Sequence, residues 1–404
     1  MAPIATDTAP ALKKYDYVPG TEHESMYISL IPYTSADEIP SGMGRPGLTG
    51  SIFIRCSRRQ AKASQPAQRR STPYWQGTLS PTKNENAYLT REKGFFYITN
   101  YGLTQEEIDY QYAIGQTLLN LPQDTKLAHR ADLSAGNYNG YRPLGNIEIL
   151  PGRHDNVEAY NVFKFVPQYE RTHPEIIHTH RASIERLHRH IHENIVFKLL
   201  RLIAIILELP EDYLLPGHSY EGDSDCHLRY MLYRARSPEE NALFENLYTR
   251  GHTDFGSLTL LFYQPVVALQ VKSSEDRRWR YVKPCPGSIT VNIADALQFW
   301  TNGFLKSSVH RVVAPPPDQA RFDRLGVMYF VRPGDRMDLS TVDSPLLRRE
   351  GFYNPDQAKE QGDQKAITAG EWVRARVRRN WEKPPEDRKG SISIGGVQTR
   401  VFHE

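Results

Sequence analysis

The stretch YTRGHTDFGSLTLLF, residues 248–262, joins two side chains of metal-ligand type to a run typical of a strand. The run that begins at Ser257 is short, and its polar and apolar residues favour a strand with a buried face. Just before it, His252 and Asp254 lie two positions apart, so they point to the same side of an extended chain. The stretch therefore presents an imidazole and a carboxylate to one divalent ion. A single extended segment cannot surround a metal, so a third ligand has to come from another strand.

Short segments with a period of two continue on both sides of this stretch. Turns rich in glycine, proline or charge divide them, which is typical of a β-sandwich or barrel. The predicted strands are HLRYMLY (227–233), SLTLLFY (257–263), ALQVKS (268–273), WRYVKP (279–284), SITVNIAD (288–295), SSVHRVV (307–313) and RLGVMYFVR (324–332). The predicted fold class is mainly β with flanking helices.

One of these strands, SSVHRVV, offers His310 as the third ligand. Two histidines and one carboxylate leave three positions open on a metal, which is the facial triad of non-haem Fe(II) oxygenases. Such an iron needs an electron source, and a cosubstrate such as 2-oxoglutarate needs a cation for its distal carboxylate. Arg324 begins a later strand, and its planar guanidinium matches a carboxylate with two hydrogen bonds. Tyr233, at the end of the first strand, can add a phenol hydrogen bond.

The N-terminal half alternates strand and helix signals. MYISLIPY (26–33) and the segment around Phe95–Ile98 favour strands, and the segment 104–122 favours a helix. Thr104 followed by Glu107 forms a capping-box pattern at the start of that helix. The longest helix is predicted within 174–210, where apolar residues recur every three or four positions. A further helix is predicted at 367–384.

Five histidines crowd the segment 174–210, which invites a metal-site interpretation. Residues two apart on a helix do not face each other, so only His188 and His192 share a face. The segment also lacks the glutamate that an H-E-x-x-H motif requires. We therefore expect these histidines on the polar face of the helix and its border.

The composition indicates a folded protein of ordinary charge. The chain has 404 residues, 39% of them hydrophobic, and a net charge of +3, so nucleic acid and membrane surfaces are not expected partners. Three distant cysteines favour a reducing compartment, and the first residues lack an apolar signal core. A soluble cytoplasmic monomer is expected. The segment 42–87 is rich in Arg, Ser, Gln and Pro and is expected to be a disordered insertion.

Two blocks give the chain a family resemblance. GHTDFGSLTLLF (251–262) and NIADALQFWTNGFLKSSVHRVV (292–313) resemble the catalytic domain of Fe(II)/2-oxoglutarate-dependent dioxygenases, in the branch that includes isopenicillin N synthase. GFFYITNYGL, YNGYRPLG and EAYNV are similar to the N-terminal and middle blocks of that branch. The resemblance spans roughly 26–33, 91–210 and 227–333. The general character of the amino-acid sequence is typical of fungal members.

The resemblance implies a double-stranded β-helix, or jelly-roll, core preceded by a helical N-terminal region. The implied organisation is a flexible tail at 1–25, an N-terminal region at 26–210 containing the insertion at 42–87, a catalytic jelly roll at 220–335, and C-terminal loops and a helix at 336–404.

The resemblance also carries roles over to individual residues. His252, Asp254 and His310 match the iron ligands, and Arg324 and Tyr233 match the residues that bind 2-oxoglutarate. The family motif Arg-x-Ser is altered, because Gly326 stands where serine is usual and shares a face with Arg324. Loss of that hydroxyl costs about 1 kcal/mol if water replaces it.

The function implied is oxidation of a small molecule by Fe(II), O2 and 2-oxoglutarate, with release of succinate and CO2. Hydroxylation, desaturation and ring rearrangement remain open, and a specialised metabolite is the expected substrate class. Phe255, Tyr141 and Tyr160 are the candidate substrate contacts. Gly326 keeps open an isopenicillin N synthase-like oxidase that uses O2 without 2-oxoglutarate. A non-catalytic jelly roll with a structural metal ion, or with none, is the alternative outside enzymes.

Overall fold

The computed structural model describes residues 11–17, 27–28, 32–33, 94–273, 277–355, 367–382, 390–394 and 397–401. The insertion expected at 42–87 lies outside these residues.

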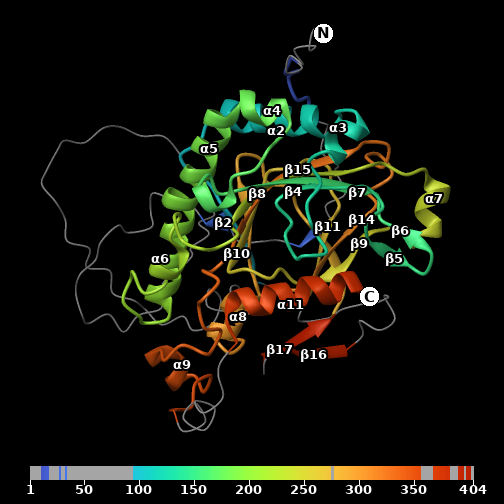
Figure 1. Cartoon of the computed structure of the whole chain (residues 1–404). Coiled ribbons are helices and arrows are strands. Elements are labelled where there is room, and N and C mark those ends of the chain that lie inside the picture. Colours follow the sequence, from blue (N-terminus) through green and yellow to red (C-terminus); the bar gives the residue numbers. More distant parts are fainter. Residues whose placement is uncertain are drawn as a thin grey trace, which may run out of the picture.

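Two sheets form the centre of the molecule, as the sequence predicted (Figure 1). The smaller has the order β1-β12-β11-β14-β9 and the larger the order β2-β3-β13-β10-β15-β8-β7-β4. The strands of the smaller sheet are Tyr27–Ile28, Trp279–Val282, Leu269–Lys272, His310–Val313 and Leu247–His252, in that order. Those of the larger sheet are Pro32–Tyr33, Phe95–Ile98, Ile289–Ile293, Leu258–Phe262, Arg324–Val331, His227–Tyr233, Val157–Phe163 and Gly140–Arg142. This is the jelly-roll core.

Strand register defines which residues of the larger sheet face the smaller one. The ring of Phe95 on β3 contacts the ring of His310 on β14 edge to face, with centroids 5.5 Å apart. From Phe95 the cross-strand pairs run through Asn292 and Thr259 to Phe330 on β15. Because alternate residues of a strand share a face, every second residue from these points lines the interior between the sheets. The interior therefore includes polar as well as apolar side chains.

Helices cover the outer face of the larger sheet (Figure 1). Helix α2 (Gln105–Leu119) begins at the capping box predicted from Thr104 and Glu107. Gln111 accepts a hydrogen bond of 2.7 Å from the hydroxyl of Tyr230 on β8, and Gly115 leaves room for the Tyr230 ring. A side chain at position 115 would collide with that ring, so the glycine sets how closely the helix approaches the sheet.

The segment 174–210 forms successive helical pieces. These are α4 (Glu175–Thr179), α5 (Arg181–Arg189), a π-helical turn at His190–Val196 and α6 (Phe197–Ile206). The expectation that its histidines lie on the polar face is wrong for His188 and His192, which are fully buried. The π-helical turn changes the direction of His192, which lies within it, whereas His188 precedes the turn and is buried on α5. Both rings pack around Tyr329 on β15 instead of facing water.

The N-terminal segment 11–17 also differs from the expectation of a flexible tail. Tyr15 is buried and stacks on Tyr112 of α2 with ring centroids 4.9 Å apart. Tyr17 packs edge to face against both rings. Aromatic rings in such contact stabilise each other beyond simple burial. This part of the expected tail is therefore part of the core.

Nearer the other end of the chain, helix α11 (Ala369–Glu382) lies where the terminal helix was predicted. It runs across the lower edge of the two sheets (Figure 1), and Trp372 packs against Phe255 and Phe299. The sequence analysis missed the hairpin of β16 (Gly390–Ile394) and β17 (Val397–Val401). It also extended one strand into α8 (Asp295–Trp300), which starts directly after β13.

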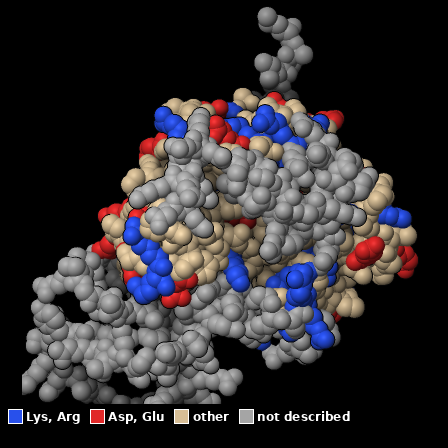
Figure 2. Space-filling model, turned by 90° about the horizontal axis from the view of Figure 1, so that it is seen from below, with Lys and Arg blue, Asp and Glu red and all other residues tan. Residues whose placement is uncertain are grey.

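The surface carries charge of both signs. On the face seen from below, the described lysine and arginine side chains form small separate groups among uncharged residues (Figure 2). No helix in the described part of the chain is long and apolar enough to cross a membrane.

Candidate metal and cosubstrate site

His252, Asp254 and His310 come together between the two sheets. Asp254 Oδ1 lies 3.9 Å from His252 Nε2 and 3.7 Å from His310 Nε2. One ligand atom from each of the three residues lies within 4.8 Å of the other two. The two histidines are direct cross-strand partners on β9 and β14, and Asp254 follows the end of β9. This donor set and spacing fit one metal ion.

Both imidazoles are oriented by backbone carbonyls. His252 Nδ1 donates to the carbonyl of Arg250 at 2.8 Å, and His310 Nδ1 donates to the carbonyl of Ser308 at 3.1 Å. With the proton held on Nδ1, each Nε2 keeps a free lone pair directed at the shared space. Such partners fix the tautomer and the ring angle of a metal ligand.

Asp254 is held in the same manner through one oxygen. Its Oδ2 accepts hydrogen bonds from Thr259 Oγ1 at 2.7 Å and from Asn292 Nδ2 at 3.0 Å. Burial raises the pKa of this carboxyl, but the neighbouring imidazoles and these two hydrogen bonds outweigh it and lower the pKa to about 2. Asp254 is therefore ionised at neutral pH, with Oδ1 available to a cation.

Arg324 lies in the same interior, at the opposite end of the larger sheet's inner face. It is 4% exposed, and its Nε donates to the carbonyl of Val266 at 3.1 Å. Burial lowers its pKa, although the nearby hydroxyls of Tyr233, Tyr112 and Tyr15 act in the other direction. The ion pairs found among the described residues include none for Arg324. A buried guanidinium without a carboxylate partner fits an anionic ligand.

Tyr233 lies beside this guanidinium, as its cross-strand partner on β8. The Arg324 guanidinium carbon is 5.8 Å from the centre of the Tyr233 ring, and the Tyr233 hydroxyl is 3.1 Å from Thr249 Oγ1. The two residues proposed for the cosubstrate are thus neighbours.

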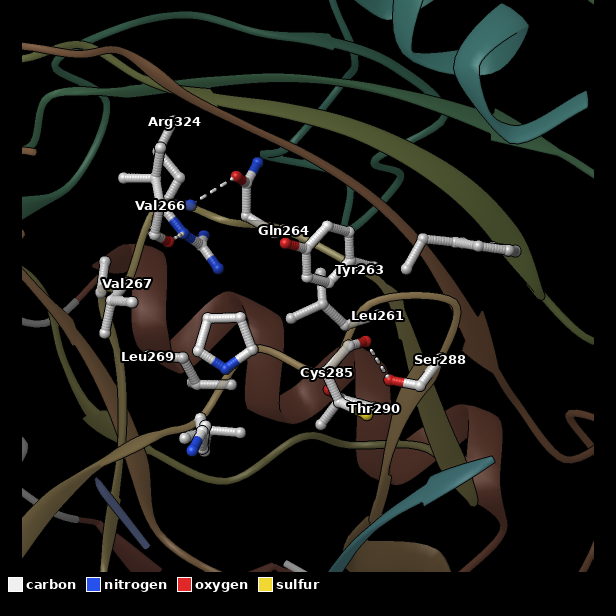
Figure 3. A pocket seen from close by; sticks show the side chains of 15 residues that line it. Leu261, Tyr263, Gln264, Val266, Val267, Leu269, Cys285, Ser288, Thr290 and Arg324 are labelled. Atoms are coloured by element: carbon white, nitrogen blue, oxygen red, sulfur yellow. Dashed lines mark hydrogen bonds between the residues drawn. The ribbon is translucent and has the colours of Figure 1, made fainter. Parts of the chain in front are cut away.

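A small pocket opens directly in front of Arg324 (Figure 3). Leu261 and Thr290 line it, from β10 and β13. They lie two positions from Thr259 and Asn292, which hold Asp254. Two residues of a strand span about 7 Å. The lining of the pocket therefore comes within two strand positions of the residues that hold Asp254.

Gly326 shares the inner face of β15 with Arg324, as predicted from the period of two. A Cβ atom at this position would lie 3.1 Å from the terminal methyl of Met328. The flexible Met328 side chain occupies the space beside the glycine that the hydroxyl of a serine would share.

Of the three candidate substrate contacts, one lies at the site and two do not. Phe255 follows Asp254 and packs against Trp372 of α11 with ring centroids 5.7 Å apart, so it lies beside the metal ligands. Tyr141 and Tyr160 are not at the site. They are paired across β4 and β7 on the outer face, where Tyr141 donates to Glu158 and Tyr160 bonds to His173. The expectation that they contact substrate is wrong, because their strand parity directs them under the helices.

The sequence analysis missed two inner-face arginines. Arg229 on β8 is the cross-strand partner of Met328, and Arg332 directly follows β15. Burial lowers the pKa of Arg229 to about 10, and the charge of Asp254 acts in the opposite direction. Burial also acts to lower the pKa of Arg332, but the charges of Tyr138, Asp225 and Asp254 outweigh it and raise that pKa. Both arginines therefore lie in the field of the metal-ligand carboxylate.

The period of two would have identified both residues. Counting back from Tyr233 along β8 in steps of two reaches Arg229, and counting forward from Arg324 along β15 in the same steps reaches Arg332.

Comparison with known proteins agrees with this site. Residues 223–333 match the family described as the 2OG-Fe(II) oxygenase superfamily, and residues 88–182 match the N-terminal family of the non-haem dioxygenase in morphine synthesis. UPF0676 protein C1494.01 of Schizosaccharomyces pombe is 30% identical, over 75% of this chain and 90% of its own length. The chain belongs to the 2OG-Fe(II) oxygenase superfamily. This oxygenase is therefore an oxidoreductase that uses Fe(II), 2-oxoglutarate and O2.

Other relatives of this oxygenase match it over most of their own length. A 2-oxoglutarate-dependent dioxygenase of Didymella fabae is 26% identical, over 70% of this chain and 94% of its own. The solved structure of a putative 2OG-Fe(II) oxygenase family protein from Caulobacter crescentus superimposes with a TM-score of 0.59 at 24% identity, covering 72% of this oxygenase and 90% of the Caulobacter chain. The jelly-roll fold predicted from the sequence is confirmed.

Proposed function

We propose that this oxygenase oxidises a small organic molecule at an iron held by His252, Asp254 and His310, with 2-oxoglutarate bound between that iron and Arg324. For hydroxylation, one C–H bond of the substrate and one O2 are consumed. 2-Oxoglutarate loses CO2 to become succinate, one oxygen atom enters the new C–OH group and the other enters succinate. The observation that carries the proposal is Arg324, a buried guanidinium that has no carboxylate partner among the described residues. It lines a pocket whose Leu261 and Thr290 lie two strand positions from the residues that hold Asp254.

Each residue has a distinct task. When bound, the iron supplies O2 activation and removal of hydrogen from the substrate. The chain itself fixes geometry: the Arg250 and Ser308 carbonyls hold both imidazoles, and Thr259 and Asn292 leave only one Asp254 oxygen free. Arg324 binds the distal carboxylate of 2-oxoglutarate through paired hydrogen bonds. Arg324 is 4% exposed, and this burial strengthens its pairing with a carboxylate, whereas His252 keeps 38% of its side chain exposed.

Titration with Fe(II) and 2-oxoglutarate in the absence of O2 tests the assignment. The wild type is expected to develop a weak visible charge-transfer band. Asp254→Ala is expected to abolish it, and Arg324→Gln to raise the 2-oxoglutarate concentration needed for it at least tenfold. Arg311→Gln is the matched control, because Arg311 of β14 lies over the ring of Trp279 on β12, across the intervening strand β11. A full band in Asp254→Ala would contradict the metal assignment.

The substrate class proposed is a specialised metabolite. A metabolite library is to be screened for compounds that increase succinate release by the reconstituted wild type. Product formed with O2 uptake but without succinate would contradict the proposed reaction and favour the oxidase alternative that Gly326 kept open. Mass spectrometry of the product separates a gain of one oxygen from a loss of two hydrogens.

A further inference from the structure

Two arginines, Arg332 and Arg376, lie over the ring of Phe255, and a third, Arg229, lies on the inner face of β8 opposite Met328. The Arg332 guanidinium carbon is 5.3 Å from the centre of the Phe255 ring, and the Arg376 carbon, from α11, is 5.5 Å from it. Arg229 lies over the ring of Phe330, with its guanidinium carbon 4.4 Å from the ring centre. Guanidinium groups lie readily over aromatic faces. We call Arg229, Arg332 and Arg376 the arginine cluster.

Arg332 is buried without full use of its donors. It is 6% exposed, and its Nε and Nη1 have no hydrogen-bond acceptor among the described residues. Asp225 Oδ1 is the nearest carboxylate oxygen, 3.7 Å from Nε, which is too long for a hydrogen bond. The other Asp225 oxygen already accepts from the Tyr138 hydroxyl. Buried donors without acceptors are unfavourable unless a ligand satisfies them.

Arg229 has neutral partners only. Its Nε donates to Asn161 Oδ1 at 2.6 Å, and its Nη2 lies 3.4 Å from His227 Nε2. Burial lowers its pKa to about 10, and the ion pairs of the described residues include none for it. The negative charge of Asp254 does not balance the cluster once a divalent metal is bound. Arg332 keeps only the long ion pair with Asp225, and Arg229 has no ion pair among the described residues, so both guanidinium groups can accept a carboxylate ligand.

Aromatic rings lie around the Arg332 guanidinium. Phe255, Phe330 and Tyr138 all lie within 6 Å of the Arg332 guanidinium carbon. Gly256 allows β15 to approach here, since a side chain at position 256 would collide with the Val331 carbonyl. The site thus offers donors for an oxyanion next to aromatic surface. A carboxylate on a hydrocarbon or aromatic body matches both features.

We infer that the substrate of this oxygenase is an organic carboxylate, whose carboxylate group is bound by Arg332 and Arg229 while its apolar body lies against Phe255 beside the metal. This inference rests on the proposed function and adds the chemical class of the substrate. Two cationic sites then divide the interior: Arg324 serves the cosubstrate, and the arginine cluster serves the molecule that is oxidised.

Matched acid and amide probes test the inference. The oxygenase is loaded with Fe(II) and one equivalent of 2-oxoglutarate without O2, then titrated with benzoate, 3-phenylpropanoate and octanoate and with their carboxamides. Calorimetry and the change in the charge-transfer band report binding. At least one acid is expected to bind tenfold or more tightly than its amide. Equal affinity for acids and amides, or no binding of any acid, would overturn the inference.

Variants connect that preference to the cluster. Arg332→Gln and Arg229→Gln are each expected to weaken acid binding at least tenfold, leave amide binding unchanged and retain the band. Arg332→Lys keeps the charge but not the planar fork, so it is expected to restore part of the acid affinity. Arg236→Gln is the control, because Arg236 stacks on Phe244 beyond the end of β8.

The outcomes separate this inference from the proposed function. A wild type that forms no band contradicts the proposed function itself. A normal band with an acid preference that survives in the double variant Arg229→Gln/Arg332→Gln overturns only the role of the cluster.

Discussion

Gly326 and Met328 set the local chemistry beside Arg324. In the absence of a serine hydroxyl at position 326, the guanidinium has one fewer polar neighbour on its own strand. Met328 lies where a side chain at position 326 would need space, but an unbranched thioether moves readily. We therefore expect the glycine to weaken cosubstrate binding without blocking the pocket.

Replacing this glycine tests that account. Gly326→Ser is expected to lower the 2-oxoglutarate concentration for half-maximal band formation about fivefold, since one hydrogen bond contributes about 1 kcal/mol. Gly326→Ala adds the same Cβ without the hydroxyl and serves as control. An equal change in both variants would mean that contact with Met328, not the hydroxyl, governs the affinity.

The sequence was informative about residues wherever spacing determined direction. His252 and Asp254 share a face because they are two apart, and His310 lies opposite because β9 and β14 pair at that position. Tyr141 was misplaced, because residue type alone does not tell which face of β4 is the inner one. Arg332 was overlooked, because a charged residue at a strand end usually faces solvent.

At the scale of elements, the π-helical turn His190–Val196 determines which side chains of the longest helical segment enter the core. It directs His192 into the core, where Nδ1 lies 2.8 Å from the Tyr329 hydroxyl and Nε2 lies 2.6 Å from the His218 carbonyl. Helical periodicity predicted the segment but not the irregular turn. Hydrogen bonds to β15 and to the loop before β8 decide this detail, and they come from distant sequence.

This buried histidine makes stability depend on pH. Burial lowers the pKa of His192 to about 4, while an unfolded histidine titrates near 6.5. Between these values the unfolded chain binds a proton that the folded chain does not. Stability therefore rises with pH across this window, by about 1.4 kcal/mol per unit for one such group.

His192→Gln removes this contribution. The free energy of unfolding is measured in urea at pH 5 and at pH 6.5 for the variant and the wild type. The increase in this free energy with pH is expected to be smaller in His192→Gln than in the wild type, by about 1.4 kcal/mol per pH unit. His154→Gln, at an exposed position of β6 (Arg153–His154), is the control. The same pH slope in His192→Gln and the wild type would contradict the account.

At the scale of the whole molecule, segments near both ends of the chain pack against the jelly roll. Residues 11–17 pack over α2 near Arg324, and α11 packs over Phe255 beside the metal ligands. The sequence predicted α11 as a helix but not its location. Docking of α11 depends on contacts with residues far away in sequence, such as Phe299. A local sequence pattern does not predict such contacts.

Shortening the chain tests the role of α11. A chain ending at residue 355 loses Trp372, which is 1% exposed, so its free energy of unfolding is expected to fall by at least about 3 kcal/mol. It is expected to keep the Fe(II) and 2-oxoglutarate band, because α11 contains neither a metal ligand nor Arg324. A chain ending at residue 382 keeps α11 and is the control. Loss of the band at 355 would contradict this division of roles.

The position of α11 also has a consequence for how the protein matures. A ribosome completes both β9 and β14 before it makes residues 367–382, and N-terminal parts of a chain fold first during synthesis. The three metal ligands can therefore assemble while the side near Phe255 is still uncovered. Iron can then reach its ligands in the nascent protein before Trp372 of α11 packs on Phe255, and in the completed structure 38% of the His252 side chain is still exposed.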